Sequence, residues 1–391
     1  MDQSPEPSTP IPFVWHPRTR RHDPSAEFWL GVRAPNSEVL ERVNVIRAAL
    51  IRAGHPEVTA SDPDLDSLLA VHSPGLVEHL RTIHDAWVVG GYPDDPGQDR
   101  VVPYVFPTEG MLGGLPAHRA AAVHARAGQY CYDTMTLIGP GTWDAVEGAA
   151  GAALTAADMV AQAAWVDSAS GSSGTAGSAM WGPGVIPMAY ALCRPPGHHA
   201  ARDAFGGSCY LNNAAIAAQR LREQGARRVA ILDVDAHHGN GTQTIFYGRG
   251  DVFCGSVHVD PGAGWFPHFM GFADETGRGS GSGANLNIAL PGRSGDDRWL
   301  TAVEQLVHDA GVFGADALVV ALGVDAAVED PKSPLRVTRD GLRATGILLG
   351  GMGIPTVAVQ EGGYHLPSLG GLVSDCLAGM AEGAARAAGT S

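Results

Sequence analysis

The sequence predicts a single large α/β domain, built on a mostly parallel β-sheet with helices on both of its faces. Two observations lead to this prediction. From residue 189 onward, short apolar runs alternate with longer segments whose apolar residues recur at helical spacing, as in repeated strand–helix units. The chain of 391 residues is 45% hydrophobic and 17% charged, which is enough apolar surface for one large core. Ligands of such sheets bind beyond the carboxyl ends of the strands, so candidate site residues are sought there.

Three segments interrupt this regular pattern. Residues 1–35 are rich in Pro, Arg and His and predict an N-terminal loop, while the Gly- and Pro-rich residues 90–128 predict a long surface excursion. Residues 168–184 are rich in Gly and Ser and predict a mobile insertion. Residues 1–391 as a whole are expected to form one domain. The expected strands are 189–193, 229–234, 252–257, 317–322 and 355–359, and the expected helices are 38–53, 145–166, 213–224, 299–310 and 338–349.

Charge and cysteine content exclude several classes of protein. The formal net charge of −15 repels phosphate backbones, so no nucleic acid partner is expected. The chain has no run of about 18 apolar residues, and its first ten residues are polar, so neither a membrane partner nor an export signal is expected. The five cysteines are odd in number and widely spaced, which is typical of reduced, buried thiols in a cytoplasmic protein.

Residues that carry chemistry follow the first two expected strands. The turn after strand 189–193 reads Arg-Pro-Pro-Gly-His-His and ends in His198 and His199. At the end of strand 229–234, Asp233, Asp235 and His237 are spaced two residues apart, which places them on one side of an extended chain. Two carboxylates and an imidazole at the end of an apolar strand are unfavourable unless they bind a metal or one another.

The later strands supply a third carboxylate and a tyrosine. Asp325 follows strand 317–322 after Gly323 and Val324. Together with Asp235 and His237 it gives three N/O ligands and leaves a fourth position open, as in catalytic zinc sites. The last strand ends in Glu-Gly-Gly-Tyr, where two glycines allow a sharp turn that can direct the Tyr364 hydroxyl into the same crevice.

Taken together, these segments resemble the histone deacetylase superfamily, and more closely its acetylpolyamine amidohydrolase-like branch and the class II-like bacterial deacetylases. The resemblance extends from about residue 189 to 383 and is thin before residue 128. It implies the arginase/deacetylase fold and a hydrolase that cleaves an acylated amine to the amine and a carboxylate. The matching segments are Arg194–Ala200, Cys209–Asn213, Leu232–Gln243, Gly271–Gly277, Leu322–Asp325, Asp330–Pro331 and Glu361–Tyr364.

The resemblance also implies two kinds of bound ion. Asp235, His237 and Asp325 would bind the catalytic zinc, with ferrous iron as the alternative in the cell. Members of the family also hold monovalent cations, usually potassium, in a structural role. The residues that match the inner potassium site are Asp233, Asp235, His237, Ser256 and Val257, and those that match part of the outer site are Phe246, Arg249 and Val252.

Catalytic roles follow from the same resemblance. His199 would act as general base and then general acid, and His198 would act mainly through its charge. Asp233 matches the carboxylate that pairs with His198, and Asn240 matches the partner of His199. A neutral Asn leaves its histidine less basic than an Asp would, which suits a base that works near neutral pH. Tyr364 would donate a hydrogen bond to the developing oxyanion.

Departures from the family pattern concern the substrate. Ser208, after Gly207, stands where relatives place an aromatic wall of the substrate channel, so a wider channel is expected, with Phe266 as the opposite wall. Lys332, the only lysine of the chain, stands where relatives are commonly apolar and face the channel. The alternative is an ordinary surface lysine. Glu27 matches an acidic residue that polyamine-type relatives use for a cationic tail. Repulsion from Lys332, only partly offset by a distant Glu27, predicts a bulkier, neutral or anionic small-molecule N-acyl amine in preference to acetylpolyamines.

Other functions remain open. The substrate could be an acetylpolyamine or a protein acetyl-lysine, and a homodimer could form through residues 90–128. A binuclear manganese ureohydrolase, as in the arginases, needs a second Asp two residues beyond each anchor, where this chain has Gly239 and Ala327. A non-catalytic binding protein on the same fold is the alternative from another class, although such proteins lose ligands or the tyrosine. All six expected metal-binding and catalytic residues are present here.

Overall fold

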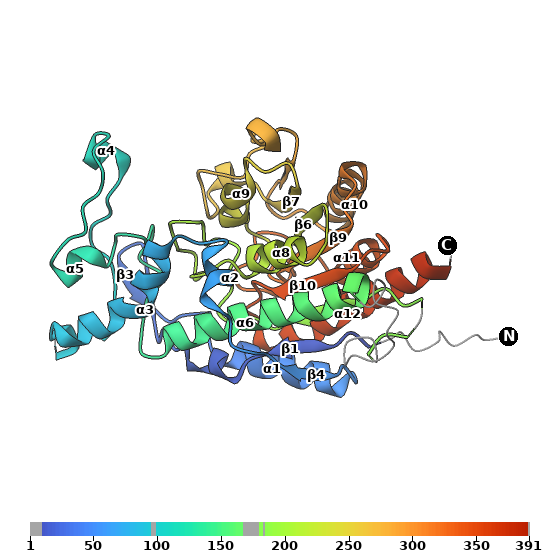
Figure 1. Ribbon diagram of the computed structural model, residues 1–391, viewed down its shortest axis with the longest axis horizontal. Helices are drawn as coiled ribbons and strands as arrows, with labels where there is room; N and C mark the ends of the chain where they lie inside the picture. Colours follow the sequence, from blue (N-terminus) through green and yellow to red (C-terminus); the bar gives the residue numbers. More distant parts are fainter. Residues whose placement is uncertain (1–9, 95–98, 167–179, 183, 390–391) are drawn as a thin grey trace.

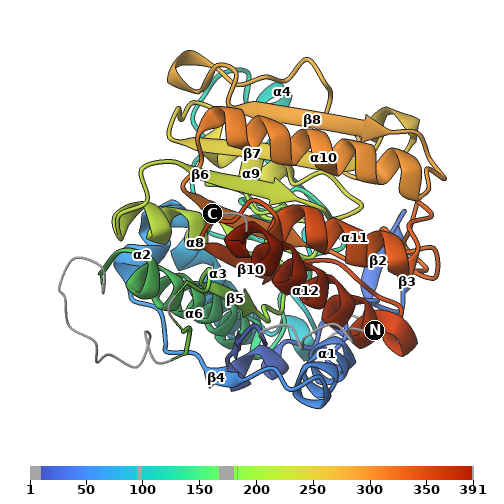
Figure 2. The same ribbon diagram turned by 90° about the vertical axis from the view of Figure 1, so that its right-hand side faces the viewer.

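Eight parallel strands form the central sheet of the computed structural model, which describes residues 10–94, 99–166, 180–182 and 184–389. Their order is β4-β1-β5-β10-β9-β6-β7-β8, and Figure 2 shows it from β4 at the bottom to β8 at the top. A small antiparallel hairpin, β2 and β3, lies outside the sheet. The strands are β1 Phe13–Trp15, β2 Glu27–Trp29, β3 Val32–Ala34, β4 Glu57–Thr59, β5 Met188–Ala191, β6 Val229–Asp233, β7 Val252–Val259, β8 Asn285–Leu290, β9 Ala317–Leu322 and β10 Thr356–Gln360.

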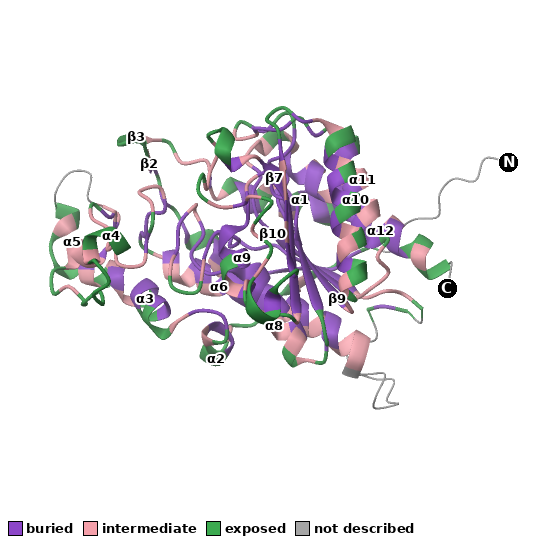
Figure 3. Cartoon of the chain, turned by 90° about the horizontal axis from the view of Figure 1, so that it is seen from above, coloured by how far each residue is buried: buried purple, intermediate pink, exposed green. Residues whose placement is uncertain are grey.

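Helices cover both faces of the sheet, and Figure 3 shows the two helical layers on either side of the buried strands. Alternate residues of the strands belong to different cores: Ala189 and Ala191 lie in one, and Tyr190 in the other. Because both faces are covered, the central strands β5, β10, β9 and β6 are buried along their whole length and are mostly apolar. One core is covered by α1 Glu41–Arg52, α10 Asp296–Phe313, α11 Arg339–Gly350 and α12 Leu366–Gly389, and the other by α2 Leu65–Leu69, α3 Pro74–Val89, α6 Thr142–Ala161, α8 Asn213–Glu223 and α9 Asn240–Phe246.

The predicted fold class is confirmed, and each expected strand and helix has a counterpart. The prediction of a loop over residues 1–35 is wrong for Phe13–Trp15, which form β1 between β4 and β5, and for Glu27–Trp29 and Val32–Ala34, which form the β2–β3 hairpin. A three-residue strand is too short to show a period of two. The predicted mobile insertion at 168–184 lies almost entirely on residues 167–179 and 183, outside the described residues.

The described residues of the 90–128 segment, 90–94 and 99–128, form an arm that Figure 1 shows projecting from the body of the protein. The arm contains η2 Tyr92–Asp94, α4 Glu109–Leu112 and α5 Val123–Arg126. Tyr104, Met111 and Leu115 are each at least 67% exposed on it. Among the described residues, no helix has both the length and the apolar character needed to cross a bilayer.

A buried ion cluster ties the N-terminal part of the chain to the carboxyl edge of the sheet. Oε1 of Glu38 lies 2.9 Å from Nη1 of Arg42 and 2.9 Å from Nε of Arg194. Burial raises the pKa of Glu38, but the two guanidinium groups outweigh burial and hold it below its ordinary value. Arg42 also donates hydrogen bonds to the carbonyl oxygens of Glu361 and Gly363. One carboxylate therefore holds the turns that follow β5 and β10.

We expect Glu38→Gln to lower the free energy of unfolding by about 3–5 kcal/mol, because it leaves two buried guanidinium groups without their counter-charge. Urea unfolding, followed by circular dichroism, measures the change. Glu41→Gln is the matched control, since Glu41 is exposed on the same stretch of chain. Equal stability of the two variants would show that the cluster is not a structural anchor.

Candidate active site

The carboxyl ends of β5, β10, β9 and β6 lie side by side, because these strands are neighbours in the sheet. The turns that follow them bring together residues that are far apart in the sequence. The site residues expected on these turns are His198 and His199 after β5, Tyr364 after β10, Asp325 after β9, and Asp235 and His237 after β6.

Three of these residues form a compact cluster of possible metal ligands. Nδ1 of His237 lies 3.0 Å from Oδ2 of Asp325 and 3.3 Å from Oδ1 of Asp235. The predicted strand alternation is not what groups them, since β6 already ends at Asp233. Instead, the backbone turns, and Oδ1 of Asp235 accepts a hydrogen bond from the His237 N–H at 2.9 Å.

The surroundings of this cluster fit a bound cation. One ligand atom from each of Asp235, His237 and Asp325 lies within 4.8 Å of the others. A Cβ at Gly323 would clash with the carboxylate of Asp235, and a Cβ at Gly362 would clash with those of Asp235 and Asp325. The two glycines therefore let the backbone pack directly against the carboxylates. The nitrogen and oxygen donors of the cluster are ligands that zinc and ferrous iron accept.

The two adjacent histidines have different partners. Nδ1 of His198 donates to Oδ2 of Asp233 at 3.0 Å, and Nδ1 of His199 donates to Oδ1 of Asn240 at 2.7 Å. The ring centroids lie 4.0 Å apart. Both rings are buried. The hydrogen bonds to Asp233 and Asn240 use the Nδ1 atoms and not the Nε2 atoms. Asp233 and Asn240 are thus in contact with the histidines that the resemblance pairs with them.

Their different partners shift the two pKa values in opposite directions. Burial lowers the pKa of His198, but Asp233 and Asp235 outweigh burial and raise it well above its ordinary value. Burial, followed by the charge of His198, lowers the pKa of His199 well below its ordinary value. The pair therefore holds one charged and one neutral imidazole at neutral pH, a separation typical of acid–base sites.

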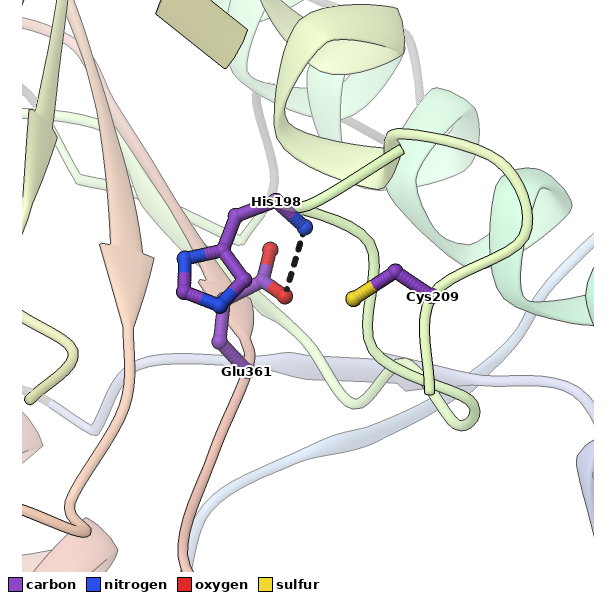
Figure 4. A group of neighbouring side chains, drawn as sticks. All are labelled: His198, Cys209 and Glu361. Atoms are coloured by element: carbon purple, nitrogen blue, oxygen red, sulfur yellow. Dashed lines mark hydrogen bonds between the residues drawn. The ribbon is translucent and has the colours of Figure 1, made fainter. Parts of the chain in front are cut away.

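Glu361 is a buried residue of the site to which the sequence reasoning gave no role. Its Oε2 accepts hydrogen bonds from the backbone N–H groups of Gly197 at 2.7 Å and His198 at 3.1 Å, and Figure 4 shows it beside His198 and Cys209. Among the described residues its Oε1 has no hydrogen-bond partner, and burial raises the pKa of Glu361 to about 7. Nδ1 of His198 and Oε2 of Glu361 already have hydrogen-bond partners. We therefore interpret Glu361 as a residue that holds the backbone of the histidine turn.

Tyr364 is held by contacts on both its backbone and its ring. Oδ2 of Asp330 accepts hydrogen bonds from the N–H groups of Tyr364 and His365, and the guanidinium carbon of Arg42 lies 4.8 Å from the centre of the tyrosine ring. Burial raises the pKa of Tyr364 well above its ordinary value although Arg42 opposes the shift. The hydroxyl therefore keeps its proton and can donate it in a hydrogen bond.

Three of the residues expected near the substrate, Phe266, Gly207 and Ser208, lie beside His199. The Phe266 ring meets the His199 ring edge-on, with centroids 4.7 Å apart, and a Cβ at Gly207 would clash with His199. Ser208 follows in a left-handed conformation with φ of 63°. These residues therefore border the expected base.

Lys332 and Glu27 are not separate charges, as the sequence analysis assumed, but an ion pair. Nζ of Lys332 lies 3.1 Å from Oε1 of Glu27. The side chain of Glu27 is 8% exposed and that of Lys332 is 43% exposed. Because the carboxylate is in contact rather than distant, the expectation of a net positive, repulsive Lys332 is wrong. The sequence could not show a contact between residues so far apart in the chain.

The residues matched to potassium lie beside the metal cluster. Asp233 and Ser256 are paired in register on β6 and β7, and both line a cavity of about 10 Å³. A cavity of that size holds roughly one small ion or water molecule. Of the outer set, the Phe246 carbonyl already accepts a hydrogen bond from the Arg249 N–H at 2.8 Å, and Val252 begins β7.

The parallel sheet, the Asp–His–Asp cluster at its edge and the buried histidine pair define the class of protein, a metal-dependent hydrolase of α/β type. The histone deacetylase domain family matches residues 36–380. The acetylpolyamine amidohydrolase of Mycoplana ramosa is 38% identical over 356 residues, which are 91% of this chain and 95% of that protein. A crystal structure of the acetylpolyamine aminohydrolase from Burkholderia pseudomallei matches with a TM-score of 0.83 at 38% identity, covering 95% of this chain and 98% of the other. The chain belongs to the histone deacetylase family, and it is a hydrolase of acylated amines.

We expect one tightly bound divalent transition ion per chain. A side chain at Gly239 would clash with Asp233, so this turn has no room for the additional carboxylate that a binuclear site requires. Elemental analysis of the purified protein measures the content, and chelation followed by titration with zinc should restore turnover at one equivalent. Two tightly held transition ions per chain at full occupancy would contradict this prediction.

Proposed function

We propose that the protein removes an acetyl or other short acyl group from a small acylated amine, with zinc bound by Asp235, His237 and Asp325. The observation that carries this proposal is the placement of the three ligands at one edge of the sheet together with His198, which is paired with Asp233, and His199, which is paired with Asn240. Ferrous iron fits the same donor set. When bound, either ion supplies a Lewis acid that polarises the amide carbonyl and makes water more acidic.

In the proposed mechanism the chain's own residues move one proton and stabilise one charge. Nε2 of the neutral His199 accepts a proton from the attacking water and later delivers it to the leaving amine, while Asn240 holds the ring by its Nδ1. His198, charged and paired with Asp233, stabilises negative charge nearby. Tyr364 donates its hydroxyl proton in a hydrogen bond to the developing oxyanion.

For the substrate, we propose an acylated amine that lacks further ammonium groups near the amide. The relatives named acetylpolyamine amidohydrolases favour a small amine over a protein as the substrate. The Lys332–Glu27 pair argues against a polycationic one, because the ammonium of Lys332 already neutralises a carboxylate that a substrate ammonium would otherwise contact.

Further proposals concern structural ions, assembly and location. We propose a structural potassium ion beside Asp233 and Ser256, supported by the small cavity that both residues line. A homodimer through the arm of residues 90–128 is supported by the exposed apolar side chains there. The net charge of −15 argues against a nucleic acid partner, and five free cysteines, all buried, support a cytoplasmic location.

We expect Tyr364→Phe to lower kcat by about 10²- to 10³-fold, because it removes a donor that acts on the transition state. Turnover of a fluorogenic acetyl amide measures the change. Metal content and melting temperature, measured on the same sample, should match the wild type, since the hydroxyl is not a ligand. An unchanged kcat would remove Tyr364 from the mechanism.

We expect Lys332→Met to raise kcat/KM for N-acetylspermidine, relative to a neutral acetyl amide of similar length, by about fivefold. The variant frees the Glu27 carboxylate for a substrate ammonium, a contact at a partly exposed site that is worth about 1 kcal/mol. The double variant Glu27→Gln/Lys332→Met is the control and should return the ratio to the wild-type value. A ratio that does not respond to Lys332→Met would show that this pair has no part in selecting the substrate.

A further inference from the structure

Tyr132 lies beside the proposed base, although the sequence gave no reason to single it out. Its ring is nearly parallel to that of Phe266, with centroids 6.3 Å apart and planes 18° apart. Phe266 in turn meets the His199 ring edge-on. Tyr132 keeps 36% of its surface exposed, so its ring is not simply part of the core.

Two contacts hold the Tyr132 ring in this place. Its hydroxyl donates a hydrogen bond to the carbonyl oxygen of His199 at 3.0 Å. The ring also covers the backbone of Gly206 so closely that any Cβ there would clash with it. The ring is therefore anchored both to the histidine turn and to the turn that contains Ser208.

The segment of Tyr132 is fastened to the turn of residues 206–209. Oδ2 of Asp133 accepts the Gly207 N–H at 2.6 Å, and Oγ1 of Thr136 accepts the Ser208 N–H at 2.8 Å. The turn is closed by reciprocal backbone hydrogen bonds between Gly206 and Cys209. Ser208 has no aromatic side chain, whereas the aromatic ring of Tyr132 lies against the turn that contains Ser208.

We propose that Tyr132 is a specificity-determining residue, which supplies the aromatic wall opposite Phe266 that residue 208 does not. This inference rests on the proposed function and deepens it: the preferred substrates carry an unbranched apolar chain next to the amide, which packs against the two rings. The channel is then bounded by two rings rather than widened by the loss of one.

The test compares two hydroxamates, both of which chelate the metal, on the zinc-loaded protein. One carries a long linear apolar linker and the other is acetohydroxamate, which has none. We expect Tyr132→Leu to weaken the long compound about tenfold and acetohydroxamate less than twofold, by isothermal titration calorimetry. Tyr132→Phe, which keeps the ring, should bind the long compound within about threefold of wild type.

Tyr130→Leu is the matched control, since the Tyr130 ring packs against His79 instead, with centroids 5.2 Å apart. It should leave both affinities unchanged. Equal weakening of both hydroxamates by Tyr132→Leu, or no weakening of the long one, would overturn the proposal. Hydrolysis of a simple acetyl amide by the wild type tests the proposed function separately. The binding comparison does not depend on that result, because hydroxamates chelate the metal whether or not Tyr132 contacts the linker.

Discussion

The buried carboxylate of Glu38 is the constraint on which the arrangement of the site depends. It lies between two guanidinium groups, and each of these reaches a different catalytic turn. Arg194 begins the turn that carries His198 and His199, while Arg42 binds the carbonyls of the turn that carries Tyr364. A buried charge is tolerated only when its partners are in place, so the same interaction that makes burial acceptable also sets the distance between the two turns.

The hydrogen-bond partners of the two histidines separate the roles that we propose for them. His198 faces the carboxylate of Asp233, whereas His199 faces the neutral amide of Asn240. Both rings are buried and lie against each other, so a charge on one disfavours a charge on the other. Burial lowers the pKa of both rings, and the carboxylates of Asp233 and Asp235 outweigh burial only for His198. In the proposed mechanism His199 is then the ring that accepts a proton. The two histidines are both buried, so their partners rather than their exposure distinguish them.

Local spacing and strand ends were enough to predict the fold class and the main cluster from the sequence. The turn after β6 shows the limit: Asp235 and His237 do lie together, but through a backbone turn rather than through strand alternation. Contacts between remote segments were not predictable. Glu27 and Lys332 are 305 positions apart, and Tyr132 reaches Phe266 from a segment without regular periodicity. Strand β1 was not predicted, because a strand of three residues is too short to show the alternation of side chains that identifies a strand in a sequence.

In the proposed function, these remote contacts also select the substrate. The net charge of −15 attracts cationic amines in general, but salt screens that attraction over about 8 Å at physiological ionic strength. Selection must therefore come from groups within contact distance of the bound molecule. The Lys332 ammonium pairs with the Glu27 carboxylate, and the rings of Tyr132 and Phe266 lie nearly parallel. In the proposed function both features favour a neutral carbon chain over a charged one. In the proposed function, the three candidate ligands and the two histidines carry out the reaction. In the same proposal, the substrate is selected by a few side chains from segments that only the folded chain brings together.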